Sequence, residues 1–508
     1  MFTLNLHLYT FLLLLLLLSS TATAATQPPY TPTDHFLLNC GSTTNSTSSD
    51  GRNWDGDTHS KFSPSTTTTT TTTTSTNPSG AGVPFTTARI FHSPFTYTFP
   101  VSPGPKFLRL YFNPATPNFS TSFFSVTAGQ HSLLTNFSAF LAESPPLSNL
   151  VKEYFLNVKN TPKLDVTICP SPNSFAFLNG IEIVSIPEGF YVRNENVDHI
   201  PLVGQNTFFE IDNNTSFETL YRLNVGGNYV PATGDTGMFR EWYQDDDYIY
   251  GAALGLLVHR NVPIEYTSET PNYSAPETVY TTTRTMGNLS LFYNLTWLFP
   301  VDAGFYYLVR LYFCEIQLEV TKENQRMFRI FINNQTAEEE ADVIAWSGGT
   351  GIPVFKDYVV QVVDTDGRRS KRYLWLAMHP NLETGSQYGN AILNGLEIFK
   401  LNNSDGSLAG RNPDSQSIKP PPYRASPEKG KSKAFLVIVA VTGGVIGGIA
   451  LLSILEGGGA MSTEDDDNVF SGSTKRLTWS ESSEKSTSKN DGFKAEPIFS
   501  ELLNPTGR

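Results

Sequence analysis

Two stretches of the chain, Phe177-Leu178-Asn179-Gly180-Ile181-Glu182-Ile183 and Ile392-Leu393-Asn394-Gly395-Leu396-Glu397-Ile398, share one pattern of residues. Further pairs of similar stretches occur in the same order along the chain: residues 35–41 and 220–226, 51–55 and 239–243, 99–101 and 299–301, and 108–112 and 309–313. Strands that were similar by coincidence would not keep a shared order. The sequence therefore predicts a duplicated domain, with copies over residues 30–200 and 215–402.

Both copies have the composition of β structure. The chain holds 35 Phe and 22 Tyr, and aromatic and β-branched residues suit pleated, half-buried surfaces. Residues 107–112, 307–313 and 328–332 are short runs of this kind. Asp366-Gly367, between residues 359–363 and 373–378, predicts a hairpin turn. Many short strands with Gly, Pro and Asn turns predict an all-β ectodomain of two tandem β-sandwiches, or jelly rolls.

The formal net charge of the 508 residues is −13. Proteins that bind nucleic acids generally need a basic field to neutralise phosphate groups, so we expect no nucleic-acid partner. An acidic surface instead favours basic partners.

Two apolar segments predict how the chain relates to a membrane. Residues 11–18 contain a run of leucines, with Ala22-Thr23-Ala24 after it, which predicts a signal peptide over residues 1–24. Residues 434–455 carry no charge and are long enough to cross the hydrocarbon core as one transmembrane helix. One face of this helix carries only glycines, which would allow close helix packing and dimerisation: Gly443, Gly444, Gly447 and Gly448.

The orientation of the predicted span rests on two opposed signals. Lysines before the span and acidic residues after it favour a cytosolic N-terminal side. The signal peptide favours the reverse, and large domains cross regardless of charge. We therefore expect a single-pass type I protein of the plasma membrane with its N-terminal domain outside the cell.

Asn-x-Ser/Thr sequences occur only before the predicted span. This distribution predicts N-glycosylation in the secretory pathway. The predicted sites are Asn45, Asn118, Asn136, Asn213, Asn214, Asn272, Asn288, Asn294, Asn334 and Asn402.

Three segments lack the residues for a core. The threonine-rich run at residues 65–76 predicts a disordered loop within the first copy, open to O-glycosylation. Residues 403–433 are polar and contain Pro420-Pro421-Pro422, which predicts an extracellular stalk. Residues 456–508 are rich in serine and charge, which predicts a disordered cytosolic tail.

Cys40, Cys169 and Cys314 are the three cysteines of the chain, too few for a disulfide framework. A disulfide between Cys40 and Cys169 would close one bridge within the first copy. The alternative is three buried small apolar side chains.

The sequence contains no Gly-x-Ser-x-Gly nucleophile elbow and no His-Glu-x-x-His zinc motif, and we expect no catalytic residue, metal or cofactor. A glycoside hydrolase would need a paired acid and nucleophile, which the sequence cannot locate among its carboxylates. Asp245-Asp246-Asp247 would suit calcium or a basic peptide, with a solvated loop as the alternative.

An aromatic ring beside a carboxylate can hold a sugar ring. The candidate ligand-binding residues are therefore Trp54 with Asp55 and Asp57, and Trp242 with Asp245. These groups recur at the same place in both copies, so a structural role is the alternative.

Three features together resemble one family: Gly51-Arg52-Asn53-Trp54-Asp55-Gly56-Asp57, the doubled Arg-Leu-Tyr-Phe, and the doubled Leu-Asn-Gly-(Ile/Leu)-Glu-Ile. Over about residues 30–455 the chain resembles the malectin-like receptor kinases of plants, the FERONIA, ANXUR and THESEUS group. The resemblance implies two tandem malectin-like β-sandwich domains at the cell surface, a role in cell-wall sensing, and binding of a small basic secreted peptide with a GPI-anchored co-receptor. Some members bind pectin, but an acidic ectodomain suits a basic peptide better.

The sequence departs from this family after the predicted span. The family carries a cytosolic Ser/Thr kinase, and its ATP loop, His-Arg-Asp and Asp-Phe-Gly motifs are absent from residues 456–508, although residues 497–508 resemble the tail that follows the kinase. We therefore expect a receptor-like protein without its own kinase, acting as a decoy or co-receptor, alone or as a homo- or hetero-dimer with full-length relatives. The alternatives are a carbohydrate-binding (pectin-binding) wall tether and a gene-model fragment of a full-length receptor kinase.

Overall fold

The computed structural model describes residues 29–413, with gaps at 59, 63–70, 76–81, 116, 143–148, 160, 193–197, 252–253, 287–292, 365–366 and 368–370. The predicted signal peptide, the predicted span with Gly443, Gly444, Gly447 and Gly448, and the predicted tail lie outside the described residues. Within the described ranges, no helix combines the length and the apolar character that a membrane crossing requires.

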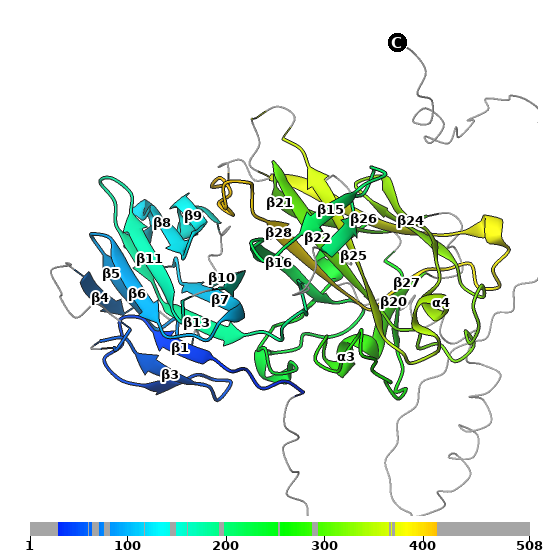
Figure 1. Cartoon of the computed structure of the whole chain (residues 1–508), viewed down its shortest axis with the longest axis horizontal. Coiled ribbons are helices and arrows are strands. Elements are labelled where there is room, and N and C mark those ends of the chain that lie inside the picture. Colours follow the sequence, from blue (N-terminus) through cyan, green and yellow to red (C-terminus); the bar gives the residue numbers. More distant parts are fainter. Residues whose placement is uncertain are drawn as a thin grey trace, which may run out of the picture. The chain divides into compact units, whose positions relative to one another are not determined.

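The first repeat is built from short strands joined by turns (Figure 1). Its outer strands alternate between buried and less buried side chains, as in β6, where Phe95, Tyr97 and Phe99 are buried. This alternation arises because successive side chains of a strand point to opposite faces. The elements are β1 (His35–Asn39), β2 (Ser46–Thr47), β3 (Asn53–Gly56), β4 (Thr71–Ser75), β5 (Thr87–Phe91), β6 (Phe95–Phe99), β7 (Gly104–Phe112), η1 (Pro117–Thr121), β8 (Phe124–Ala128), β9 (His131–Phe137), α2 (Ala139–Ala142), β10 (Leu150–Val158), β11 (Leu164–Pro170), β12 (Ala176–Leu178) and β13 (Gly180–Ser185).

The second repeat has the same order of strand pairing as the first. Strand β1 pairs with β13 as β16 pairs with β28, and β7 lies between β13 and β10 as β22 lies between β28 and β25. The elements are β16 (Phe217–Asn224), η2 (Ala232–Gly234), β17 (Tyr243–Gln244), η3 (Asp246–Tyr248), β18 (Ile249–Tyr250), β19 (Leu256–His259), α3 (Glu277–Tyr280), β20 (Thr282–Thr285), β21 (Leu295–Asp302), β22 (Phe305–Phe313), β23 (Phe328–Ile332), β24 (Gln335–Ala341), α4 (Val343–Ser347), β25 (Val354–Val362), β26 (Lys371–Pro380), η5 (Leu382–Thr384), β27 (Ile392–Leu393) and β28 (Gly395–Leu401).

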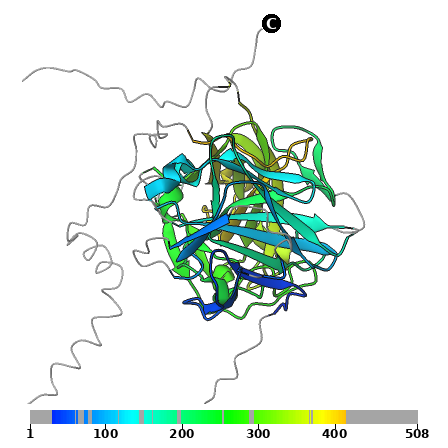
Figure 2. The ribbon, with the colours of Figure 1, turned by 90° about the vertical axis from the view of Figure 1, so that its left-hand side faces the viewer.

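Each repeat has an apolar core between two layers of strands. In the first repeat, Leu110 and Phe112 of β7 pack with Phe124 and Val166 of the sheet β6-β11-β8-β9. In the second, side chains of β22 pack with those of the sheet β18-β21-β26-β23-β24. Figure 2 shows the first repeat, in blue and cyan, facing the viewer. The prediction of an all-β fold is confirmed.

One sheet runs through both repeats. Strand β10 of the first repeat pairs antiparallel with β16 of the second, with Glu153 opposite Thr219 and Phe155 opposite Phe217. This pairing joins the strands into an 11-stranded sheet in the order β2-β3-β1-β13-β7-β10-β16-β28-β22-β25, with β17 on β16. The repeats therefore share backbone hydrogen bonds as well as side-chain contacts.

A hairpin of β14 (Asp198–Pro201) and β15 (Phe208–Ile211) lies in the connection between the repeats. The backbone N–H of Val203 donates to the carbonyl of Val359 at 2.8 Å. The hairpin thereby covers part of the edge of β25, which would otherwise offer unpaired backbone groups.

Part of the threonine-rich run is ordered, contrary to the prediction of a disordered loop over residues 65–76. Thr71–Ser75 form strand β4, which pairs antiparallel with β5 over its full length. Threonine is β-branched and suits a strand, so this part of the prediction is wrong.

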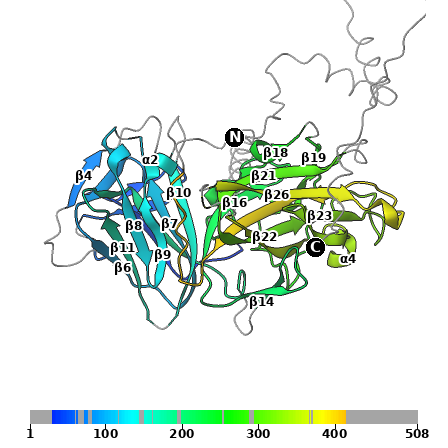
Figure 3. The ribbon, with the colours of Figure 1, turned by 90° about the horizontal axis from the view of Figure 1, so that it is seen from above.

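The hairpin predicted around Asp366-Gly367 is also wrong. The strand before it, β25, pairs with β22 in the shared sheet, whereas the strand after it, β26, pairs with β21 and β23 in the other layer. Figure 3 shows β22, the pairing partner of β25, and β26 as separate strands of the second repeat. The connection therefore crosses between layers.

The three cysteines are free thiols. Cys40 is fully buried in the core of the first repeat, whereas Cys169 is exposed on the outer face of β11. Because the two side chains lie on different sides of a sheet layer, the predicted Cys40–Cys169 disulfide is not formed. Cys314 is buried, as the alternative interpretation expected.

The predicted stalk begins later than residue 403. Residues 403–413 fold back onto the first repeat, where the backbone of Leu408 donates to Ser132 at 2.8 Å. The remainder of the predicted stalk lies outside the described residues.

Candidate functional site

A row of alternating charges crosses the shared sheet. Its members come from neighbouring strands, β13, β7, β10, β16, β28, β22 and β25. All are buried except the last, which is partly exposed. In strand order they are Glu182, Arg109, Glu153, Arg222, Glu397, Arg310 and Asp357.

The ion pairs in this row link one repeat to the other. Arg109 lies 2.8 Å from an oxygen of Glu182 and 2.6 Å from an oxygen of Glu153. Arg222 of the second repeat donates from Nη2 to Glu153 at 2.8 Å and from Nε to Glu397 at 2.5 Å. Arg222 is therefore the residue that joins the two halves of the row.

The position of the row follows from the two faces of the shared sheet. Along β7, Leu108 and Leu110 point into the core of the first repeat, whereas Phe107 lies in a second cluster with residues of the other repeat. Because side chains alternate, Arg109 points to the same face as Phe107. The same alternation in β22 places Arg310 on that face.

Burial makes these charges dependent on one another. Burial alone would raise the pKa of Glu153, but the positive charges of Arg222 and Arg109 outweigh it and lower this pKa to about 2. The pKa of Glu182 also lies well below its usual range, because burial is again outweighed, chiefly by Arg109. Both carboxylates are thus ionised while their arginines are in place.

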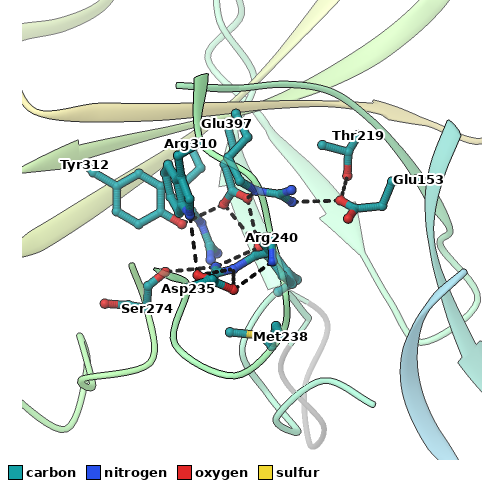
Figure 4. A network of polar contacts seen from close by, with 12 residues as sticks. Glu153, Thr219, Asp235, Met238, Arg240, Ser274, Arg310, Tyr312 and Glu397 are labelled. Atoms are coloured by element: carbon teal, nitrogen blue, oxygen red, sulfur yellow. Dashed lines mark hydrogen bonds and ion pairs between the residues drawn. The ribbon is translucent and has the colours of Figure 1, made fainter. Parts of the chain in front are cut away.

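Residues from the connection and from a loop of the second repeat cover the row (Figure 4). The hydroxyl of Tyr191 donates to Glu397 at 3.0 Å, and the carbonyl of Met238 accepts from Arg109 at 2.9 Å. Arg240 is fully buried with Asp235, 2.9 Å away, and donates to the Tyr191 hydroxyl at 3.3 Å. These contacts cover part of the row.

A cleft of about 390 Å³ opens over the middle of the row and is lined by both repeats. Charged residues of the row, Arg109, Glu153 and Arg222, form part of its lining. Its other side chains include Asp50, Arg52, Trp54, Phe85 and Tyr111 from the first repeat and Tyr221, Phe239, Glu241, Tyr243 and Tyr248 from the second.

The charges on the cleft walls are largely paired. Arg52 lies 2.7 Å from Asp50 and 2.8 Å from Glu182, and its guanidinium stacks 5.4 Å from the ring centre of Phe239. Glu241 accepts a hydrogen bond from Tyr243 at 3.0 Å. Aromatic faces with paired charges suit recognition of a ligand with apolar and polar groups.

The two predicted tryptophans are packed inside the protein. Trp54 is 1% exposed and Trp242 is 0% exposed. Each ring packs edge-on against a tyrosine, Tyr111 at 5.2 Å and Tyr312 at 5.5 Å between ring centres. Neither ring offers an open face for a stacked sugar, so the burial supports the structural alternative.

The paired carboxylates also have structural partners. Asp57 accepts from the backbone N–H of Gly41 at 2.8 Å and from Tyr97 at 2.9 Å, and forms an ion pair with Arg89. Asp245 makes the equivalent bonds, to Gly226 N–H at 2.9 Å, to Trp297 at 2.8 Å and to Arg284 at 2.6 Å. Neither carboxylate is therefore a solvated ligand for calcium or a peptide.

Asp55 is the exposed member of the predicted set. It accepts a hydrogen bond at 3.0 Å from Asn45, the first predicted glycosylation site. Asp246 is also exposed and pairs with Arg284 at 2.6 Å.

Most predicted glycosylation sites whose side chains are described lie on the surface. The exposed ones are Asn45, Asn136, Asn214, Asn272, Asn294 and Asn334, and the half-buried ones are Asn213 and Asn402. The side chain of Asn118 and the whole of Asn288 lie outside the described residues. N-glycosylation at these positions stays a prediction.

Several residues of the row are not among the candidate site residues that the sequence predicts. Arg109 and Glu182 lie inside the repeated stretches, where a single charge interrupts an apolar run. That interruption is a signal for a buried ion pair, because charges are rarely buried without a partner. Arg222 also interrupts an apolar run, Leu220-Tyr221-Arg222-Leu223, but comparison of the repeats does not mark it, since the matching residue of the first repeat is Leu37.

Comparison with known proteins identifies relatives of this fold. The family model of the malectin-like domain matches residues 38–401. The receptor-like protein kinase FERONIA of Arabidopsis thaliana is 45% identical over 449 residues, which cover 84% of this chain and 49% of FERONIA. ANXUR2 of Arabidopsis thaliana is 37% identical over 431 residues, covering 80% of this chain and 48% of ANXUR2. The chain thus spans about half the length of the curated relatives it matches.

Solved structures show the same similarity. The crystal structure of the plant receptor-like kinase FER matches with a TM-score of 0.68 and 45% identity, covering 75% of this chain and 99% of that one. FER also matches, with a TM-score of 0.68 and 45% identity over 76% of this chain and 99% of that one, in a crystal structure of the plant peptide RALF23 in complex with FER and LLG2.

Proposed function

The chain belongs to the malectin-like family, among relatives that are plant receptor-like kinases, and we propose that its folded part is an extracellular receptor module that binds a small basic peptide. The observation that carries this proposal is the 45% identity to FER, which was crystallised with RALF23 and LLG2. The formal charge of −13 adds a physical reason, because an acidic protein attracts a basic ligand.

In this proposal the module lies outside the cell, attached through the predicted span at residues 434–455. The predicted signal peptide and the predicted glycosylation sites support this orientation. Treatment of intact cells with a protease and of extracts with a glycosidase tests it. Loss of the folded part from intact cells and a lower mass after glycosidase are expected, whereas protection from the protease would contradict the orientation.

The peptide-binding proposal is tested with the full chain in nanodiscs and a basic peptide of the RALF23 type, with and without an LLG2-type co-receptor. We expect saturable binding that weakens as salt rises, because salt screens charges. A peptide with its basic residues replaced by glutamine is the matched control. Absence of binding in the presence of the co-receptor would contradict the proposal, and binding of an oligogalacturonide alone would favour a wall tether.

We also propose that the cleft between the repeats contacts the ligand, because its lining combines the exposed Tyr243 with partly exposed aromatic and charged side chains. Tyr243→Ala is the test, since Tyr243 is exposed on the cleft wall. At least tenfold weaker peptide binding is expected. The exposed Leu382, which is not part of the cleft lining, gives the control Leu382→Ala. Equal affinities of the two variants would exclude the cleft and leave the receptor proposal standing.

A further inference from the structure

The chain does not leave the fold at the end of its last strand. After β28 it turns through residues 403–407, where Asn403 N–H donates to Ser407 at 2.9 Å, and then lies beside β9 of the first repeat. Ser407 forms a parallel bridge with Ser132. We name residues 402–412 the strap; in Figure 1 it is the orange end of the described chain.

Two anchors hold the strap on the first repeat. Leu408 is 0% exposed and belongs to the core of that repeat, far along the sequence from its other members. The side chain of Asn412 accepts from Ser138 N–H at 3.0 Å and donates to the carbonyl of Asn136 at 2.7 Å. One apolar side chain and one amide therefore fix the strap at two points.

The strap also contacts the second repeat. Arg411 donates to the carbonyl of Gly367 at 2.9 Å, and Asn402 accepts from Ser216 N–H at 2.7 Å. A side chain at Gly410 would collide with the carboxylate of Asp302. That carboxylate cannot swing away freely, because Lys400 holds it at 2.7 Å.

The direction of loading decides which contacts break first. Pull on the chain beyond residue 413 reaches Asn412 first. It then reaches Arg411, which is bonded to Gly367 of the second repeat, then Leu408 and last the turn at Asn403, so these contacts are loaded one after another. Strand β28, which comes next, is paired on both sides, with β16 and β22. Pull on β28 must shear two ladders at once, which resists more than peeling single contacts.

We propose that the strap is a detachable mechanical element, which carries tension from the following chain to the first repeat and peels away before either repeat unfolds. It acts whether or not the module binds a peptide. Peeling of the strap, residues 402–412, adds at most about 40 Å of chain, at roughly 3.3–3.6 Å per residue. It also moves the exit point of the chain from the first repeat to the end of β28.

Single-molecule pulling of the full chain tests the proposal, with one handle at the C-terminus and one at a cysteine introduced by Leu318→Cys. Leu318 is 67% exposed on the second repeat, and Cys169→Ser removes the exposed native thiol. We expect one short extension of at most about 40 Å before the large unfolding steps. Leu408→Ala should lower the force of that step without changing the forces of the later ones.

Two further variants keep the test decisive. Asn412→Ala removes the second anchor without touching the core, so it applies even if Leu408→Ala does not fold, and it should also lower the short step. Leu382→Ala, at an exposed leucine distant in sequence from the strap, should leave the step unchanged. Release of the strap only together with a repeat, or a short step unaffected by both anchor variants, would overturn the proposal.

Amide hydrogen exchange of the same proteins provides a check without force. The Leu408 amide, bonded to Ser132, and the Ser138 amide, bonded to Asn412, should exchange at least tenfold faster in Asn412→Ala. The amides of β28 should keep their protection. Equal acceleration in β28 would show that the strap opens only with the whole repeat, and would overturn the proposal.

Discussion

Replacement of Arg222 by methionine should destabilise the whole module, because this arginine joins the two halves of the charged row. The guanidinium lies 2.8 Å from Glu153 of the first repeat and 2.5 Å from Glu397 of the second, and its side chain is 5% exposed. Methionine fills similar space but leaves two buried carboxylates with fewer partners. Breaking a buried ion pair from one side costs about 3–5 kcal/mol, and we expect a loss in this range.

The matched control is Arg329→Met in the same repeat. Arg329 also pairs with two carboxylates, Glu339 at 3.0 Å and Glu383 at 2.7 Å, but these partners are 64% and 80% exposed. Exposed pairs contribute about 0–1 kcal/mol. The assay is urea unfolding of each variant, followed by tryptophan fluorescence. A loss for Arg222→Met no larger than that for Arg329→Met would refute the inference that the row is a buried, mutually dependent network.

A double variant separates the ion pair from the loss of packing. Glu153→Gln removes one of the carboxylates that Arg222 neutralises. If the charge drives the effect, the combined loss of Glu153→Gln with Arg222→Met should be smaller than the sum of the single losses, because the pair couples. Additive losses would assign the cost to packing.

Three more outcomes follow from the described residues. The pKa of Glu153 is about 2 in the folded protein, below about 4.3 for an unfolded chain. The stabilisation by ionised Glu153 is therefore full above about pH 5 and is lost as pH falls toward 2. Glu153→Gln should weaken the decline in unfolding free energy between about pH 6 and about pH 3, and an unchanged decline would contradict this. Gly226 has φ +73°, and a Cβ there would lie 2.5 Å from the backbone of Thr283, whereas Gly304 has φ +88° in open space. In thermal unfolding, Gly226→Ala should lose about 1–3 kcal/mol more unfolding free energy than Gly304→Ala. Equal losses would show that the backbone at Thr283 can move to accommodate the methyl group. Iodoacetamide should label Cys169 alone in the native protein, and peptide mass mapping that finds it disulfide-bonded would contradict the free thiol.

The repeated stretches predicted more of the fold than local propensity did. The Leu-Asn-Gly-(Ile/Leu)-Glu-Ile stretches, which indicated the duplication, lead into β13 and β28. The Arg-Leu-Tyr-Phe stretches lie in β7 and β22, which pair with β13 and β28 in each repeat. Their buried charges, such as Arg109 with Glu182, meet across that pairing. The shared order of the similar stretches was enough to predict the duplication, because each repeat carries the same set of paired strands.

Features that depend on pairing between distant strands could not be predicted from the sequence. The Asp366-Gly367 signal is local, but the strands on either side belong to different layers. The polar neighbours of Leu408 predict a stalk, because a single apolar residue in a polar segment does not indicate that its side chain enters a core. The candidate sugar-binding tryptophans were found correctly as a repeated feature, yet the sequence could not show that both rings are enclosed.

The joined sheet requires the two repeats to differ at the point where they meet. In the first repeat, Leu37 of β1 packs with Trp54 and Tyr111. The matching position in β16 is Arg222, because β16 must also pair with β10 and face Glu153. A second copy with leucine at this position would leave Glu153 with Arg109 as its ion-pair partner in the row and Glu397 without its closest one. The divergence at this one position therefore supports a single module from two repeats, and it explains why the cleft and the charged row belong to neither repeat alone.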